Sequence, residues 1–104
     1  YVSSKNHDFC PYEYIDFIDK SAIGEIHLAG HSVEKIDDVE ILIDTHDNVV
    51  VDSVWDLYDY TIRKKGQIPT LIEWDKNLPE FSVLLNEAEK ARIILQKYSH
   101  KNAA

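Results

Sequence analysis

Residues 53–95, SVWDLYDYTIRKKGQIPTLIEWDKNLPEFSVLLNEAEKARIIL, decide the fold class of this chain. From Ser53 to Lys65, apolar residues recur at helical spacing, and Gly66 follows as a stop signal. The next run, residues 69–74, is rich in β-formers and predicts a strand. Pro79 then opens a second helix, which carries an apolar stripe along one face. A helix, a strand and a helix in this order indicate the α/β class.

The segments before this stretch extend the same pattern. We expect a short helix over residues 11–19, a strand over residues 25–29, and a second strand over residues 39–44 that is buried on both faces. The intervals suit parallel strands joined by crossovers. Three strands alone would leave open edges, so they fit an arc of a closed (β/α)8 barrel better than a free-standing sheet. We expect residues 1–104 to be the carboxyl-terminal portion of a single TIM-barrel domain, with the other strands upstream.

Composition limits the classes of partner. The chain has 104 residues, enough for at most one small domain, and 44% of them are hydrophobic, so a packed core is expected. Its formal charge of −8 disfavours nucleic acid and anionic membranes. No apolar stretch approaches the length of a membrane span. A single cysteine, Cys10, excludes an internal disulfide, and a cytoplasmic protein is expected.

Ionisable side chains fall late in the predicted strands. Asp44 and His46 share one strand face, while His27 and Glu73 lie toward the ends of the other two strands. The carboxyl ends of barrel strands form the active site of such folds. Carboxylates and imidazoles without a thiol suit divalent iron, manganese or zinc. The pattern therefore predicts a metal site that includes His27, Asp44, His46 and Glu73.

Other interpretations of these residues stay open at this point. Asp44 can cap the loop that follows it, His46 can be an exposed loop residue, and Glu73 can be satisfied by backbone amides. His31, just past the first strand, can bind metal or substrate or form a loop hydrogen bond. A metal-dependent hydrolase or isomerase and a catalytically silent interaction module are therefore alternatives to a redox enzyme.

Several motifs together resemble the carboxyl-terminal part of the UPF0276 family, which includes the oxidase components of methanobactin and thia-glutamate biosynthesis. The resemblance covers residues 1–91 and lies in NHDFCPYEYID (6–16), GEIHLAGH (24–31), ILIDTHDNVV (41–50), VWDLY (54–58) and PTLIEWDKNLPEFSVLLNEAEKA (69–91). It implies a xylose-isomerase-like TIM barrel that binds two or three iron ions and oxidises cysteine in a ribosomally made peptide. It also implies a partner protein that helps to recognise the peptide.

The resemblance also assigns residues. His27 matches a metal-ligating histidine, Asp44 and His46 match a pair on one metal, and Glu73 matches the carboxylate of the last strand. His31 and His7 fall in motif positions as possible metal or substrate ligands. The chain departs from the family pattern at Asp8, where glycine is usual, and at Cys10, where aspartate is usual. We therefore expect the loop that joins these two residues to differ in shape.

Overall fold

A pair of parallel strands forms the centre of the fold. In the computed structural model, which describes residues 1–99, β1 (Ile26–Ala29) pairs in parallel with β4 (Thr70–Glu73). The register places His27 opposite Leu71 and Ala29 opposite Glu73. Because side chains alternate along a strand, these four residues point to one face of the pair. Leu28 and Ile72 point to the other face, toward the core.

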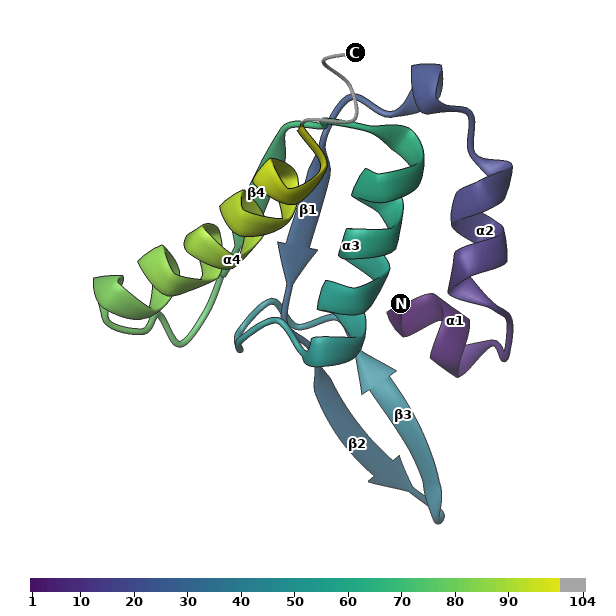
Figure 1. Ribbon diagram of the computed structural model, residues 1–104. Helices are drawn as coiled ribbons and strands as arrows, with labels where there is room; N and C mark the ends of the chain where they lie inside the picture. The colour runs from purple at the N-terminus through teal and green to yellow at the C-terminus, as the bar shows by residue number, and fades with distance from the viewer. Residues whose placement is uncertain (100–104) are drawn as a thin grey trace.

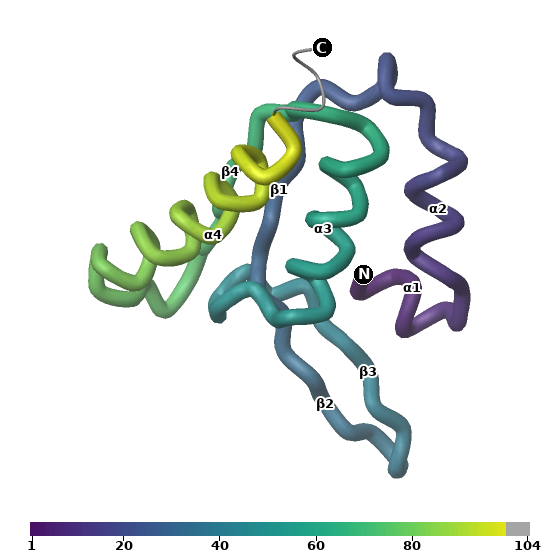
Figure 2. The backbone as a smooth tube through the Cα atoms, viewed as in Figure 1, coloured from purple at the N-terminus to yellow at the C-terminus, as the bar shows by residue number. Residues whose placement is uncertain are grey.

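Helices flank the parallel pair, and a separate hairpin extends from it (Figure 1). The remaining elements are α1 (Val2–Asn6), α2 (Pro11–Phe17), the 3-10 turn η1 (Lys20–Ala22), β2 (Ser32–Ile36), β3 (Val39–Ile43), α3 (Asp52–Lys65) and α4 (Phe81–Ser99). The tube in Figure 2 shows that α3 leads into β4 and that α4 then runs back alongside β4. The mixed α/β class is confirmed.

The strand predicted over residues 39–44 exists, but its predicted environment is wrong. β3 pairs antiparallel with β2 in a separate two-stranded sheet and does not join β1 and β4. Asp37 and Asp38 connect β2 to β3 and have φ values of 50° and 64°, which is the backbone of a tight two-residue hairpin turn. Val39 is 59% exposed, so β3 is not a strand buried on both faces.

The core lies between the parallel pair and the helices α3 and α4. Ile62 is completely buried, and the amphipathic α3 also contributes Trp55 and Tyr58 to this core. The buried hydrophobic residues are Leu28, Val50, Trp55, Tyr58, Ile62, Ile68, Ala91 and Tyr98. Helix α2 lies against α3, where Tyr60 donates a hydrogen bond to Asp16 at 2.6 Å and Lys65 donates one to the Ile18 carbonyl at 2.6 Å.

A second apolar surface has no cover among the described residues. Leu71, Phe81 and Leu85 are 49%, 71% and 53% exposed, and they line a groove of about 430 Å³ between β4 and α4. Leu71 points to the same face of the parallel pair as His27 and Glu73. Within residues 1–99, no helix is both long and apolar enough to cross a membrane.

The loop between α1 and α2 shows how the two departures from the family pattern are accommodated. Asp8 has a φ of 53°, in the left-handed region where glycine is favoured and aspartate is tolerated better than most residues. Cys10 is the N-cap of α2, and its side chain makes no capping hydrogen bond. Pro11 follows at the first helical position, where its missing N–H costs nothing.

Candidate metal centre

Glu73 lies between two histidines. Its Oε1 is 2.9 Å from Nδ1 of His27, and its Oε2 is 2.5 Å from Nδ1 of His46. The first contact follows from the register, because His27 and Glu73 point to the same face of neighbouring parallel strands. The second contact joins β4 to the loop after β3. One carboxylate therefore faces an imidazole nitrogen with each of its two oxygens.

Each imidazole also contacts a carboxylate through its other nitrogen. Nε2 of His27 forms a short contact with Glu25, and Nε2 of His46 lies 2.8 Å from Oδ1 of Asp44. A histidine that binds metal through one nitrogen commonly donates the N–H of the other nitrogen to a carboxylate, which fixes the tautomer and the ring orientation. Both rings have this arrangement, with Glu73 on the Nδ1 side.

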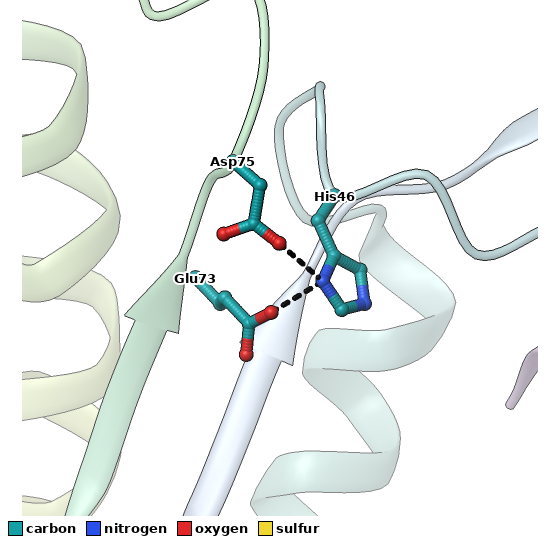
Figure 3. A group of neighbouring side chains, drawn as sticks. All are labelled: His46, Glu73 and Asp75. Carbon is teal, nitrogen blue, oxygen red and sulfur yellow. Dashed lines mark hydrogen bonds and ion pairs between the residues drawn. The ribbon is translucent and has the colours of Figure 1, made fainter.

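Asp75 adds a third oxygen donor beside His46 (Figure 3). Its Oδ2 is 3.0 Å from Nδ1 of His46, and donor atoms of His46, Glu73 and Asp75 all lie within 4.8 Å of one another. One nitrogen and two carboxylate oxygens at this spacing suit a hard or borderline divalent cation. Asp75 and Glu25 were not predicted as ligands from the sequence, although both lie two residues from a predicted ligand and so share its strand face.

Backbone hydrogen bonds of His46 connect the ends of β1, β3 and β4. Its N–H donates to the Gly30 carbonyl at 3.1 Å, and its carbonyl accepts the N–H of Asp75 at 2.6 Å. His46 has a φ of 54°, an unusual conformation for this residue that the surrounding contacts must maintain. A Cβ on Gly30 would lie only 2.2 Å from the Asn48 carbonyl oxygen, so the end of β1 approaches this loop very closely.

The carboxylates change the protonation of both rings. Hydrogen bonding to Glu25, and then to Glu73, raises the pKa of His27. Burial lowers the pKa of His46, but the hydrogen bond to Asp75 and the charges of Asp44 and Glu73 outweigh that effect, so its pKa is also raised. Without a cation, the rings therefore hold protons more tightly than a free imidazole does. A bound cation would supply the positive charge that these protons otherwise provide.

An open cavity of about 370 Å³ adjoins these groups and is lined by His27, His31, Asp44, His46 and Glu73, among others. The structure thus brings together the four predicted ligands and places His31, the possible metal or substrate ligand, in the same cavity, where its ring centroid is 5.7 Å from that of Tyr1. His7 differs, because it is exposed at the end of α1 and does not line this cavity.

The comparisons with known proteins agree on one family. A family model described as "RiPP precursor modification enzyme MbnB/TglH/ChrH" matches residues 1–96. The chain belongs to the MbnB/TglH/ChrH family. The relatives below, which are UPF0276 proteins, confirm the resemblance to that family. A UPF0276 protein of Rhizobium meliloti is 40% identical over 100 residues, covering 95% of this chain and 32% of the relative.

Two further UPF0276 proteins show the same extent of similarity. A UPF0276 protein of Anaeromyxobacter is 47% identical over 91 residues, covering 88% of this chain and 31% of its own length. One from Vibrio vulnificus is 46% identical over 96 residues, covering 92% of this chain and 33% of its own. The chain therefore spans about a third of these relatives. No solved structure matches it.

Proposed function

We propose that this chain is the carboxyl-terminal portion of a single TIM-barrel domain, in a multinuclear non-haem iron oxidase that modifies cysteine in a ribosomally made peptide. The observation that carries the proposal is the position of Glu73, with one oxygen toward His27 and the other toward His46. Family membership supports the substrate class, because the matching model describes enzymes that modify peptide precursors. Because the chain spans about a third of its relatives, the activity is that of the complete protein.

The donor set fits the metal. His27, His46, Glu73 and Asp75 offer imidazole nitrogens and carboxylate oxygens, which suit iron and also manganese or zinc. Together with Glu25 and Asp44, four carboxylates surround only two imidazoles, and divalent charge would offset this excess. Iron, when bound, supplies the one-electron chemistry that side chains lack.

The residues of the chain orient and protect this centre. Glu25 and Asp44 each accept an N–H from one ring and so leave the Nδ1 atoms directed at Glu73. The carbonyl of Gly30 holds the loop that carries His46. The cavity beside His31 admits the cysteine side chain of an extended peptide. A partner protein that presents this peptide completes the proposal.

A substitution at Glu73 tests the function. Glu73→Gln in the complete protein keeps the side-chain volume and removes the charge that faces both rings. We expect metal content, measured by elemental analysis, to fall and iron-dependent oxygen consumption with a cysteine-containing peptide to stop. Glu80→Gln is the matched control, because Glu80 is exposed and lies outside the cavity. Full oxidase activity in Glu73→Gln would overturn the proposal, and metal-dependent turnover without dioxygen would favour a hydrolase or isomerase.

A second pair of substitutions tests how Asp44 acts. The sequence predicts that Asp44 and His46 share one ion, whereas the contacts at Nδ1 favour Glu73 and Asp75 as the partners of His46. We expect Asp44→Asn to keep the metal, because the amide oxygen still accepts the Nε2 proton, and Asp44→Ala to weaken metal binding roughly 10–100-fold. An equal loss in both variants would instead make Asp44 a direct ligand.

A further inference from the structure

The β2–β3 hairpin leaves apolar side chains and a strand edge uncovered. It extends from the body of the molecule (Figure 1), and Val33, Ile36 and Val39 are 53%, 50% and 59% exposed. Within the described residues, β2 pairs only with β3. An isolated two-stranded hairpin is marginally stable, and an uncovered apolar edge is a template for another strand. The hairpin therefore has the properties of a docking element.

Within residues 1–99, the outer edge of β3 has a hydrogen-bonding partner and the outer edge of β2 has none. Leu42 donates its backbone N–H to Oδ1 of Asn6 at 2.9 Å and accepts a hydrogen bond from Nδ2 of Asn6 at 2.8 Å. Asn6 thus occupies the outer edge of β3 at Leu42. Because the backbone groups of Leu42 point outward, its partner Val33 is in a non-hydrogen-bonded pair, so the N–H and C=O of Val33 point outward from β2. The backbone N–H and C=O of Lys35, two residues further along β2, also point outward.

The hairpin also carries an excess of negative charge. Glu34, Asp37, Asp38 and Glu40 stand against a single basic residue, Lys35. All five are exposed. A strand that pairs with β2 places its own side chains directly beside those of β2, and opposite charges in such positions are favourable. The chemistry of this edge therefore selects an extended segment with apolar and basic residues.

We propose that the outer edge of β2 docks the substrate peptide, which adds as an antiparallel strand and runs into the cavity beside His31. This inference rests on the proposed function. His31 lies just before β2 and lines the cavity, while β3 leads directly into Asp44. The docking edge and the candidate metal centre are therefore continuous along the backbone.

The direction of β2 determines which end of the docked peptide lies at the cavity. β2 runs from the cavity toward the hairpin tip, so an antiparallel strand enters at the tip and leaves at the cavity. The five residues of β2 span about 17 Å. The reacting cysteine must then follow the docked segment, within a few residues of its carboxyl end. A basic residue pairs beside Glu34, and an apolar residue beside Val33.

Synthetic peptides and the complete protein test this proposal. One fluorescein-labelled peptide carries Lys-Val-Lys-Val-Lys, a Gly/Ser spacer of four residues and then cysteine; a second has glutamate in place of lysine; a third places the cysteine first. We expect the first peptide to bind, measured by fluorescence anisotropy, and the second not to bind. The first should also be oxidised faster than the third. Amides of Val33 and Lys35 should exchange hydrogen quickly in the free protein and slowly with the first peptide.

Two substitutions separate the backbone edge from its side chains. Val33→Pro removes the outward N–H without removing a β2–β3 hydrogen bond, and proline is tolerated at such an edge position. We expect it to weaken binding roughly fivefold or more, as the loss of about one hydrogen bond implies, while Val33→Ala binds nearly normally. Glu34→Lys reverses an exposed charge and should also weaken binding of the first peptide. This variant leaves the backbone N–H groups of β2 unchanged.

The outcomes distinguish the two proposals. Normal metal content and peptide oxidation with unchanged binding in Val33→Pro and Glu34→Lys would overturn the docking site alone. Slow exchange of the Val33 amide without peptide would show that a partner protein or another part of the protein covers the edge, which also overturns it. Absence of bound metal in the complete protein would overturn the proposed function, whatever the peptide binding shows.

Discussion

Substitution of Gly30 by alanine should move the loop that carries His46. The new Cβ would lie 2.2 Å from the Asn48 carbonyl oxygen and 2.6 Å from that of Val49. Ordinary contacts of carbon begin near 3.5 Å, so the loop must shift by roughly 1 Å. Because the Gly30 carbonyl accepts the His46 N–H, this shift changes the position of the ring relative to Glu73. Overpacking of this kind costs about 1–3 kcal/mol.

The assay for this prediction combines stability with metal content. We expect Gly30→Ala in the complete protein to lower the free energy of unfolding, measured by chemical denaturation, and to reduce the bound metal. Gly24→Ala is the matched control, because nothing lies within 4 Å of a Cβ at Gly24. The reasoning is refuted if Gly30→Ala keeps the stability and the metal content of Gly24→Ala.

Three further predictions concern the stability of the chain. Cys10→Asp should raise the free energy of unfolding by about 1 kcal/mol, because an aspartate N-cap supplies the hydrogen bond that Cys10 lacks, and denaturation beside Cys10→Ala checks this. Burial raises the pKa of Asp59, but hydrogen bonds from Tyr98 and Lys97 lower it more, so the net pKa is lowered. The contribution of Asp59 to the free energy of unfolding is therefore complete above its ordinary pKa of 3.8 and is lost as pH falls through the lower folded pKa. Chemical denaturation at a series of acid pH values should show this loss, and the loss should be absent in Asp59→Asn. Residues 1–104 expressed alone should aggregate or remain partly unfolded, because large apolar side chains along β4 and α4 are exposed, and a sharp thermal transition of a monomer would contradict this.

Alternation along the strands predicts four of the side chains that lie together at the candidate site. Alternation along the strands places His27 and Glu73 on one face, and the same period of two relates Asp44 to His46. These distances follow from local geometry once the two strands lie side by side. Asp75 and Glu25 have the same spacing from Glu73 and His27, but alternation alone does not distinguish a ligand from any other residue on that strand face.

The pairing of residues 39–43 could not be predicted from the same information. A run such as Ile41-Leu42-Ile43 fits a strand buried on both faces and equally fits one strand of a hairpin, because the local pattern does not include the partner. The partner, β2, alternates only weakly, and the Asp37-Asp38 turn lacks the glycine that usually signals a hairpin. The left-handed backbone of His46 depends on tertiary contacts and has no sequence signal either.

Anomalous X-ray scattering at the iron absorption edge, from crystals of the complete protein, tests the central claim most directly. The claim is that Glu73 joins His27 and His46 in one metal centre. It predicts anomalous peaks within bonding distance of the Glu73 carboxylate and of Nδ1 of His46. Iron peaks elsewhere in the protein, with Glu73 still hydrogen-bonded to both rings, would contradict it.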